Sequence, residues 1–240
     1  MLFHAYRLKV QNSNTVSDKF FTVRQEPKVW AEEHGGDQDV VTIKPWQHNL
    51  LSFDSVIVKG RKSWGAKEPI WKNEVIYYNV KAYPLNITLD RIVVHHTNNS
   101  DSISVNENKQ QGRGYAALGY HFFIDSKGDI YEGRPLEVMG SHAGTGKVSG
   151  PLNDPDWGAI GIVLQGDYHH ADDWFFSTSA PKKQLEALEK LIVALKSKYA
   201  IQRLLMHRET IRGGKATVCP GDHLVPKIED LRKKLKMQGR

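Results

Sequence analysis

The stretch Ala159-Ile160-Gly161-Ile162-Val163-Leu164 is apolar at every position, so both faces of a strand formed by it would be apolar. This pattern is typical of a strand in the middle of a sheet that is covered on both sides. Shorter apolar stretches occur at 92–94 and 119–124, and the second leads through a polar turn at 126–129 into 130–132, as in a hairpin. These stretches predict the strands of one sheet.

Helical periodicity appears later in the chain. Apolar residues recur at helical spacing after Pro181, a residue that suits the first turn of a helix, and predict a helix over 181–199. A basic stretch at the end of the chain carries a second apolar stripe, at Ile228, Leu231 and Leu235. Since strands alternate with helices from about Lys59 onward, we predict a layered α/β domain over residues 59–240.

The first 58 residues have a different character. Short β-branched or aromatic runs at 20–23, 40–43 and 55–58 are separated by polar and glycine-containing stretches, and no chemical motif occurs among them. We predict a small β-rich N-terminal appendage over residues 1–58, to which the sequence assigns no role.

Composition narrows the function. The chain has 240 residues, 40% of them hydrophobic, with a net charge of +6 and a pI near 9.2, which suits a globular protein with anionic partners. A single cysteine, Cys219, excludes an intramolecular disulfide and must be a core filler, a nucleophile or a ligand. No stretch is long and apolar enough to span a membrane, and the N-terminus lacks the pattern of a classical export signal.

Two histidines follow apolar runs, His95 after 92–94 and His207 after 204–206. The ends of strands carry functional side chains in open α/β sheets. Catalytic zinc takes three protein ligands and leaves a fourth position open. Pro220 favours an extended backbone at Cys219, and Gly221 permits a sharp turn after Pro220. A loop of this shape could direct the thiol of Cys219 toward a site.

Residues from about Arg61 to Leu235 resemble the type-2 N-acetylmuramoyl-L-alanine amidase domain, which peptidoglycan recognition proteins share with amidase-type phage lysozymes. Each matching segment is weak alone, but all occur in the order of the family. They are Arg61–Ala66, Ile92–Thr97, Gly119–Phe122, Gly128–Arg134, Gly140–Ala143, Ile160–Ile162, His207-Arg208 and Thr217–Gly221.

The resemblance implies a central mixed β-sheet flanked by helices and a zinc-dependent amidase. It implies one zinc ion on His95, His207 and Cys219, with catalytic assistance from Tyr120. Attack on an amide creates an oxyanion, which the backbone or hydroxyl of Thr217 is also available to stabilise. The substrate would be peptidoglycan or muropeptides, cut at the amide between the lactyl group of N-acetylmuramic acid and L-alanine. It also implies substrate contacts by His142 and by Asn153 or Asp154.

Neighbouring residues on a strand point to opposite faces, so only one of His95 and His96, and one of Tyr120 and His121, should face the cleft. The resemblance selects His95 and Tyr120, leaving His96 and His121 as packing groups.

The chain also departs from its relatives. Cytoplasmic recycling relatives carry a glutamate general base where this chain has Gln165, which cannot act as a base, so the tyrosine-assisted branch is expected. Phage enzymes tend to carry lysine where this chain has Thr217, and Lys215 lies nearby. The single cysteine excludes the disulfide found in many animal recognition proteins, which favours a bacterial or phage setting.

Three alternatives stay open: a peptidoglycan-binding module without activity, a basic nucleic-acid-binding protein, and a hydrolase with Cys219 as nucleophile and His207 as base. We expect no nucleic-acid partner, no membrane insertion, a monomer, and an extracytoplasmic location because the substrate lies there.

Overall fold

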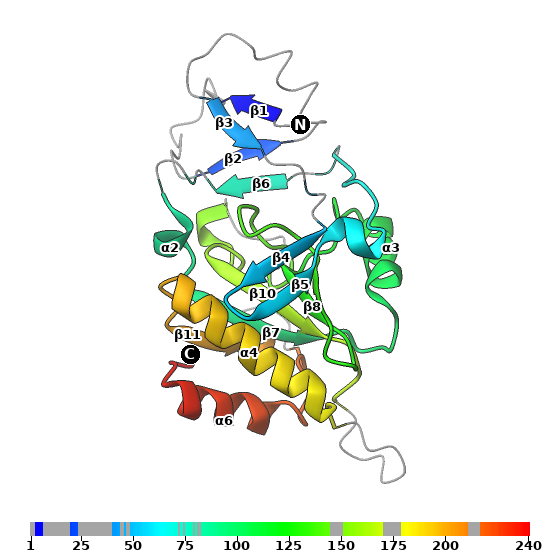
Figure 1. The fold of residues 1–240 in the computed structure, drawn as a ribbon, viewed down its shortest axis with the longest axis vertical. Helices are drawn as coiled ribbons and strands as arrows, with labels where there is room; N and C mark the ends of the chain where they lie inside the picture. The colour runs from blue at the N-terminus through cyan, green and yellow to red at the C-terminus, as the bar shows by residue number, and fades with distance from the viewer. Residues whose placement is uncertain are drawn as a thin grey trace.

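The computed structural model describes residues 3–6, 20–23, 40–43, 46, 49–71, 73, 75–78, 80, 83–144, 151–169, 179–210 and 217–240. Its centre is a seven-stranded sheet with the strand order β11-β7-β10-β8-β9-β5-β4 (Figure 1). The strands are β4 (Leu50–Phe53), β5 (Val56–Lys59), β7 (Arg91–His96), β8 (Phe122–Ile124), β9 (Ile130–Glu132), β10 (Ala159–Leu164) and β11 (Arg203–Met206).

The sheet is mixed. Strands β11, β7, β10 and β8 run parallel to one another. Strands β8 and β9 form the expected antiparallel hairpin, β9 pairs parallel with β5, and β5 pairs antiparallel with β4. Strand β10 lies between β7 and β8, and all six of its residues are buried, which confirms its predicted central position. Strand β8 begins only at Phe122, so the strand predicted over 119–124 is shorter than expected.

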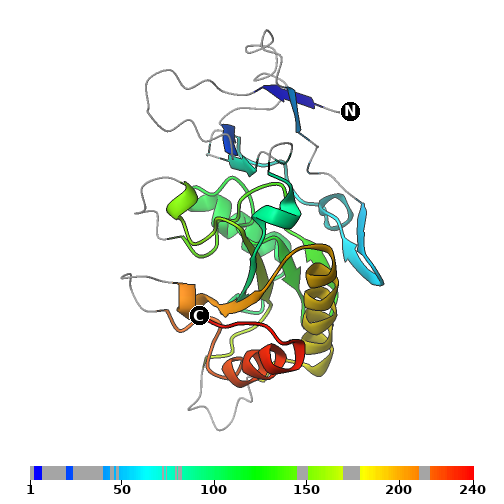
Figure 2. The same cartoon turned by 90° about the vertical axis from the view of Figure 1, so that its left-hand side faces the viewer.

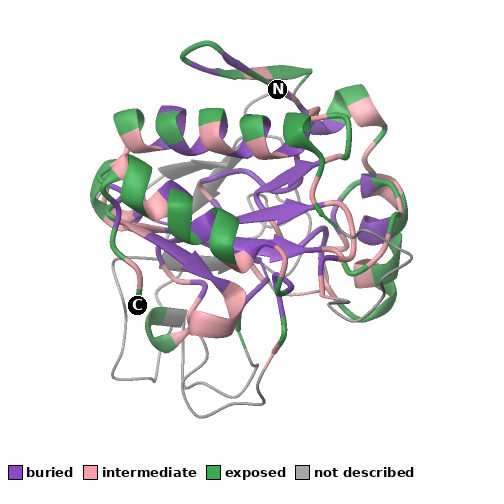
Figure 3. Ribbon diagram, turned by 90° about the horizontal axis from the view of Figure 1, so that it is seen from below, coloured by how far each residue is buried: buried purple, intermediate pink, exposed green. Residues whose placement is uncertain are grey.

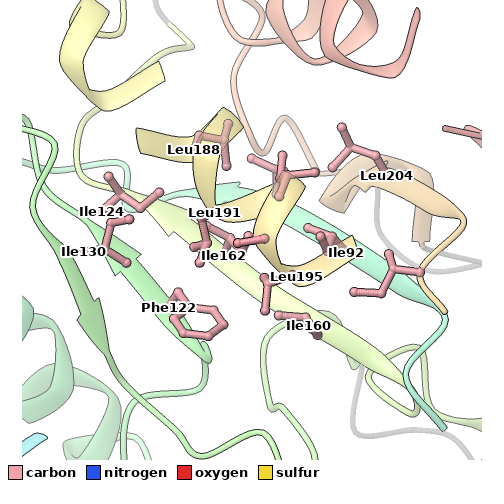
Figure 4. Packing of buried hydrophobic residues seen from close by; sticks show 14 of the residues in the cluster. Ile92, Phe122, Ile124, Ile130, Ile160, Ile162, Leu188, Leu191, Leu195 and Leu204 are labelled. Atoms are coloured by element: carbon pink, nitrogen blue, oxygen red, sulfur yellow. The ribbon is translucent and has the colours of Figure 1, made fainter. Parts of the chain in front are cut away.

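Helices α4 (Lys182–Lys198) and α6 (Val225–Leu235) cover one face of this sheet, as the sequence predicts (Figure 2). Their apolar stripes pack against alternate strand residues because successive strand side chains point to opposite faces. In Figure 4, Leu188, Leu191 and Leu195 lie over the strands that carry Phe122, Ile160 and Ile162. Figure 3 shows the outer sides of these helices exposed and the strands beneath them buried.

The other face packs against α3 (Ile103–Gly112), through a cluster of Ile103, Leu118, Phe123 and Val163. Helix α3 has no apolar stripe, so its periodicity does not reveal it, although Ser102 is a typical N-cap and accepts a hydrogen bond from the amide of Val105. Four short elements connect the layers: η1 (Arg61–Trp64), α2 (Leu85–Thr88), η2 (Pro151–Asn153) and α5 (His207–Thr210).

The N-terminal strands lie at one end of the molecule, away from α6 (Figure 1). Strand β1 (Phe3–Tyr6) pairs antiparallel with β3 (Val40–Ile43), and β2 (Phe20–Val23) pairs antiparallel with β6 (Val75–Tyr78). Residues 55–58, grouped above with the appendage, pair within the large sheet through β5. The division of the chain at residue 58 stays a prediction. Among the described helices, none is both long and apolar enough to cross a membrane.

Candidate metal centre

His95 and His207 lie at the same edge of the large sheet. His95 is near the carboxyl end of β7, and His207 directly follows β11. The two strands are parallel neighbours in which Met206 pairs with Val94. The next residues, His207 and His95, therefore lie at the same level. The register of β7 and β11 therefore brings the two imidazoles together, with ring centroids 4.5 Å apart.

Cys219 joins the two histidines from the loop before α6. One potential ligand atom from each of the three side chains lies within 4.8 Å of the other two. The Sγ atom of Cys219 is 3.7 Å from Nδ1 of His95. Ligands of a tetrahedral zinc ion, with bonds of about 2.3 Å to sulfur and about 2.0 Å to nitrogen, would be about 3.5 Å apart. The three side chains lie close enough to bind a metal, and Nδ1 is the atom that His95 presents.

Hydrogen bonds hold the cysteine loop in place. The backbone amide of Arg208, beside His207, donates to the carbonyl of Cys219 at 3.0 Å, and its guanidinium pairs with Asp222 at 2.8 Å. Gly221 has a φ of 95° and its Cα approaches the backbone of Tyr168 so closely that a Cβ atom would lie 2.3 Å from the Tyr168 carbonyl carbon. The bond between Cys219 and Pro220 is cis.

Thr217 supports the same loop. Its hydroxyl oxygen accepts a hydrogen bond from the backbone amide of Cys219 at 3.2 Å, which leaves the hydroxyl proton able to donate elsewhere. A catalytic role for Thr217 stays a prediction. Lys215 lies outside the described residues.

Tyr120 lies just before β8 and faces the same site. Its ring is 5.0 Å from the ring of His95 at an interplanar angle of 60°. Burial, and then the neighbouring Cys219, raise the pKa of the Tyr120 hydroxyl above its ordinary value. The hydroxyl therefore keeps its proton at neutral pH and can donate a hydrogen bond.

His142 contacts His95 directly. Its side chain is fully enclosed, and Nδ1 lies 3.0 Å from Nε2 of His95 and 3.0 Å from Oδ1 of Asp156. Asn153, by contrast, is an exposed residue of η2. Substrate contact by either residue stays a prediction.

His96 and His121 lie in other hydrogen-bond networks. His96 accepts from the amide of Tyr168 at 3.2 Å, and burial lowers its pKa to about 4. His121 accepts from the amide of Gly161 at Nδ1, at 3.0 Å, and donates from Nε2 to the carbonyl of Val138, at 2.9 Å. Burial, with a smaller contribution from His142, lowers its pKa to about 3. Both rings are neutral groups that tie segments of backbone together.

The electrostatics of the three-residue cluster suit a cation. Burial is the main cause that lowers the pKa values of His95 and His207, so both imidazoles are neutral, the form in which histidine binds metals. Burial also raises the pKa of the Cys219 thiol to about 12 without a metal. A bound metal cation reverses this effect, because it deprotonates a coordinating thiol.

Gly161 provides the space that His142 occupies. A Cβ atom at Gly161 would lie 2.2 Å from Cδ2 and 2.5 Å from Nε2 of His142. We expect Gly161→Ala to destabilise the protein by about 1–3 kcal/mol, because the enclosed ring has no room to move. Denaturant unfolding measures this loss. Gly112→Ala is the control, since nothing lies within 4 Å of its added Cβ, and it should not destabilise the protein.

Two residues of the site were not predicted, Asp156 and Arg208. Asp156 lies in a polar loop before β10, and Arg208 adjoins a predicted ligand. Aspartate and arginine are common in exposed loops, so their identities carry no signal. Only the fold shows that Asp156 is buried and accepts hydrogen bonds from the backbone amides of His142, Ala143 and Gly144.

Comparisons with known proteins identify the family of this chain. The family model described as N-acetylmuramoyl-L-alanine amidase matches residues 85–222. Peptidoglycan-recognition protein SD of Drosophila melanogaster is 28% identical over 200 residues, which cover 75% of this chain and 91% of the relative. The endolysin of Escherichia phage T7 is 31% identical over 124 residues, 50% of this chain and 75% of the endolysin.

Among solved structures, the N-acetylmuramoyl-L-alanine amidase LysC from Clostridium intestinale superimposes with a TM-score of 0.52 at 28% identity, covering 64% of this chain and 89% of LysC. The family match spans more than half of the chain and includes the predicted ligands His95, His207 and Cys219. The chain therefore belongs to the N-acetylmuramoyl-L-alanine amidase family.

Proposed function

We propose that this protein is a zinc-dependent N-acetylmuramoyl-L-alanine amidase, which hydrolyses the amide between the lactyl group of N-acetylmuramic acid and L-alanine of the stem peptide. The observation that carries the proposal is the cluster of His95, His207 and Cys219 beside the hydroxyl-bearing ring of Tyr120. Family membership alone would not suffice to assign an activity. The relatives include both a peptidoglycan recognition protein and an endolysin.

The donor set fits zinc. Two neutral imidazoles and one thiolate are typical zinc ligands, and three protein ligands leave one position free, as in catalytic sites. When bound there, zinc would supply a Lewis acid that polarises the scissile carbonyl and lowers the pKa of water. His95, His207 and Cys219 would hold it from two strand ends and one loop.

Tyr120 would act on the substrate as a hydrogen-bond donor. Attack on an amide carbonyl places negative charge on its oxygen, and a donor that is already in position stabilises that charge. The raised pKa of Tyr120 keeps the proton on its hydroxyl, as this role requires. Thr217 is the second candidate donor, because its hydroxyl oxygen accepts from the amide of Cys219 and the hydroxyl retains its own proton.

The opposite use of Cys219, as a nucleophile activated by His207, has less support. A nucleophilic cysteine needs a low pKa and access to substrate, whereas this thiol is buried and its pKa is raised to about 12.

Peptidoglycan lies outside the cytoplasmic membrane, so the proposed activity implies an extracytoplasmic site of action.

Metal removal tests the proposal. We expect the native protein to release stem peptides from purified peptidoglycan, to lose this activity on treatment with a chelator, and to regain it when one equivalent of zinc is added. Release is measured by chromatography of the soluble peptides. Activity that survives complete metal removal would exclude zinc catalysis and favour the cysteine nucleophile. A zinc-loaded protein that binds peptidoglycan without releasing peptide would be a recognition module.

A further inference from the structure

We propose that His142 is a positioning residue for the metal centre, which holds His95 in its ligating orientation by accepting a hydrogen bond from Nε2 of His95. The inference rests on the proposed zinc function, and it assigns His142 a role different from the substrate contact that the sequence suggests. Its basis is the placement of His142 between a predicted ligand and a buried carboxylate.

The two ring nitrogens of His95 point to different partners. Nδ1 lies 3.7 Å from Sγ of Cys219, and Nε2 lies 3.0 Å from Nδ1 of His142. A neutral imidazole that binds a metal through Nδ1 carries its proton on Nε2. That N–H then points at His142, which must accept it. An outer hydrogen bond of this kind fixes the tautomer and the ring orientation of a ligating histidine.

His142 is held firmly enough to do this. Asp156 accepts from three consecutive backbone amides, those of residues 142, 143 and 144, at 2.9–3.0 Å, which fixes the segment that carries the ring. The carboxylate is itself 2% exposed. The ring of His142 stacks parallel to that of Tyr120, with centroids 6.0 Å apart and an angle of 18°.

Two glycines complete the enclosure of this ring. A Cβ atom at Gly140 would lie 2.5 Å from Cδ2 of His142, and one at Gly161 would lie 2.2 Å from the same atom. Because both positions lack a side chain, the imidazole can approach the backbone closely at Gly140 and Gly161. The side chain of His142 is 0% exposed, so a substrate could not reach it without a rearrangement of this packing.

Metal binding through Nδ1 of His95 would decide which hydrogen bond His142 makes. Nδ1 of His142 lies 3.0 Å from both His95 and Asp156, but one nitrogen cannot accept from the first and donate to the second at the same time. The ligating form of His95 selects the first of these bonds. His142 then carries its proton on Nε2.

Zinc affinity tests this role independently of activity. His142→Phe keeps a ring but removes the acceptor, and we expect its zinc dissociation constant, measured by competition with a chromophoric chelator, to rise about 10- to 100-fold. His142→Gln retains an acceptor oxygen and should lie closer to the unaltered protein. The neighbouring Ser141→Ala should bind zinc normally. The visible spectrum of the cobalt-substituted proteins should change in the same order, because it reports ligand geometry.

The outcomes separate this inference from the proposed function. Absence of zinc binding by the unaltered protein would sink both. Normal zinc affinity in His142→Phe, with only KM increased, would overturn the inference alone and make His142 a substrate contact. If the substituted proteins fail to fold, ¹⁵N spectra of the zinc-loaded unaltered protein decide: a proton on Nε2 of His95 and none on Nδ1 of His142 supports the inference, and a proton on Nδ1 of His142 refutes it.

Discussion

Cys219→Ser should abolish both zinc binding and peptide release. Loss of an outer hydrogen bond to a ligand typically weakens metal affinity about 10- to 100-fold, so replacement of a direct ligand by a poor one should exceed about 100-fold. Serine is nearly the same size as cysteine, and the loop that carries residue 219 is held by the amide of Arg208 and by Thr217. The fold should therefore survive the substitution.

Equilibrium dialysis with zinc analysis measures the first effect, and release of stem peptides from peptidoglycan measures the second. Val218→Ala is a matched control, since this neighbouring side chain is 46% exposed and should tolerate truncation. Full activity in a zinc-free Cys219→Ser protein would contradict the proposed metal site. Normal zinc binding by Cys219→Ser would show that the thiol is not a ligand.

Tyr120→Phe should lower kcat about 100- to 1,000-fold while zinc affinity stays unchanged. This is the usual cost of removing one donor to a developing oxyanion, and it applies here because burial raises the pKa of Tyr120 and keeps the proton on its hydroxyl. The phenylalanine ring retains the contact with His95, so the change isolates the hydroxyl. Steady-state kinetics on a soluble muropeptide gives kcat and KM separately.

Tyr131→Phe is the control for this experiment. Tyr131 packs against the same apolar cluster as Tyr120, but its hydroxyl lies 3.1 Å from Asp125 in the β8–β9 hairpin. Removal of this hydroxyl should leave kcat within about twofold of the unaltered protein, because its partly buried hydrogen bond to Asp125 contributes little to stability. An increase in KM alone in Tyr120→Phe would instead assign Tyr120 to substrate binding.

Local sequence patterns predicted most of the scaffold. The apolar runs at 92–94 and 159–164 became neighbouring central strands, and the periodic stretch after Pro181 became α4. These patterns are readable because burial on a sheet or a helix face repeats with a fixed period. Helix α3 has no such period. The features that support it are the Ser102 cap and the burial of Ile103 in a hydrophobic cluster with Phe123 and Val163.

For the candidate metal site too, the sequence and the tertiary structure determined different features. The sequence by itself determined which residues could bind a metal, because only a few residue types supply nitrogen or sulfur ligands and the motifs around His95, His207 and Cys219 are local. The tertiary structure decided which side chains lie together: the register of β7 and β11 aligns the two histidines.

The tertiary structure also decided the environment of His142. Its enclosure depends on missing side chains at Gly140 and Gly161 and on the distant carboxylate of Asp156. Whether a polar side chain meets substrate or a ligand is set by residues such as Asp156 and Gly161, which lie in other segments of the chain. No local pattern records it, because the space around a side chain exists only after the strands and loops have packed.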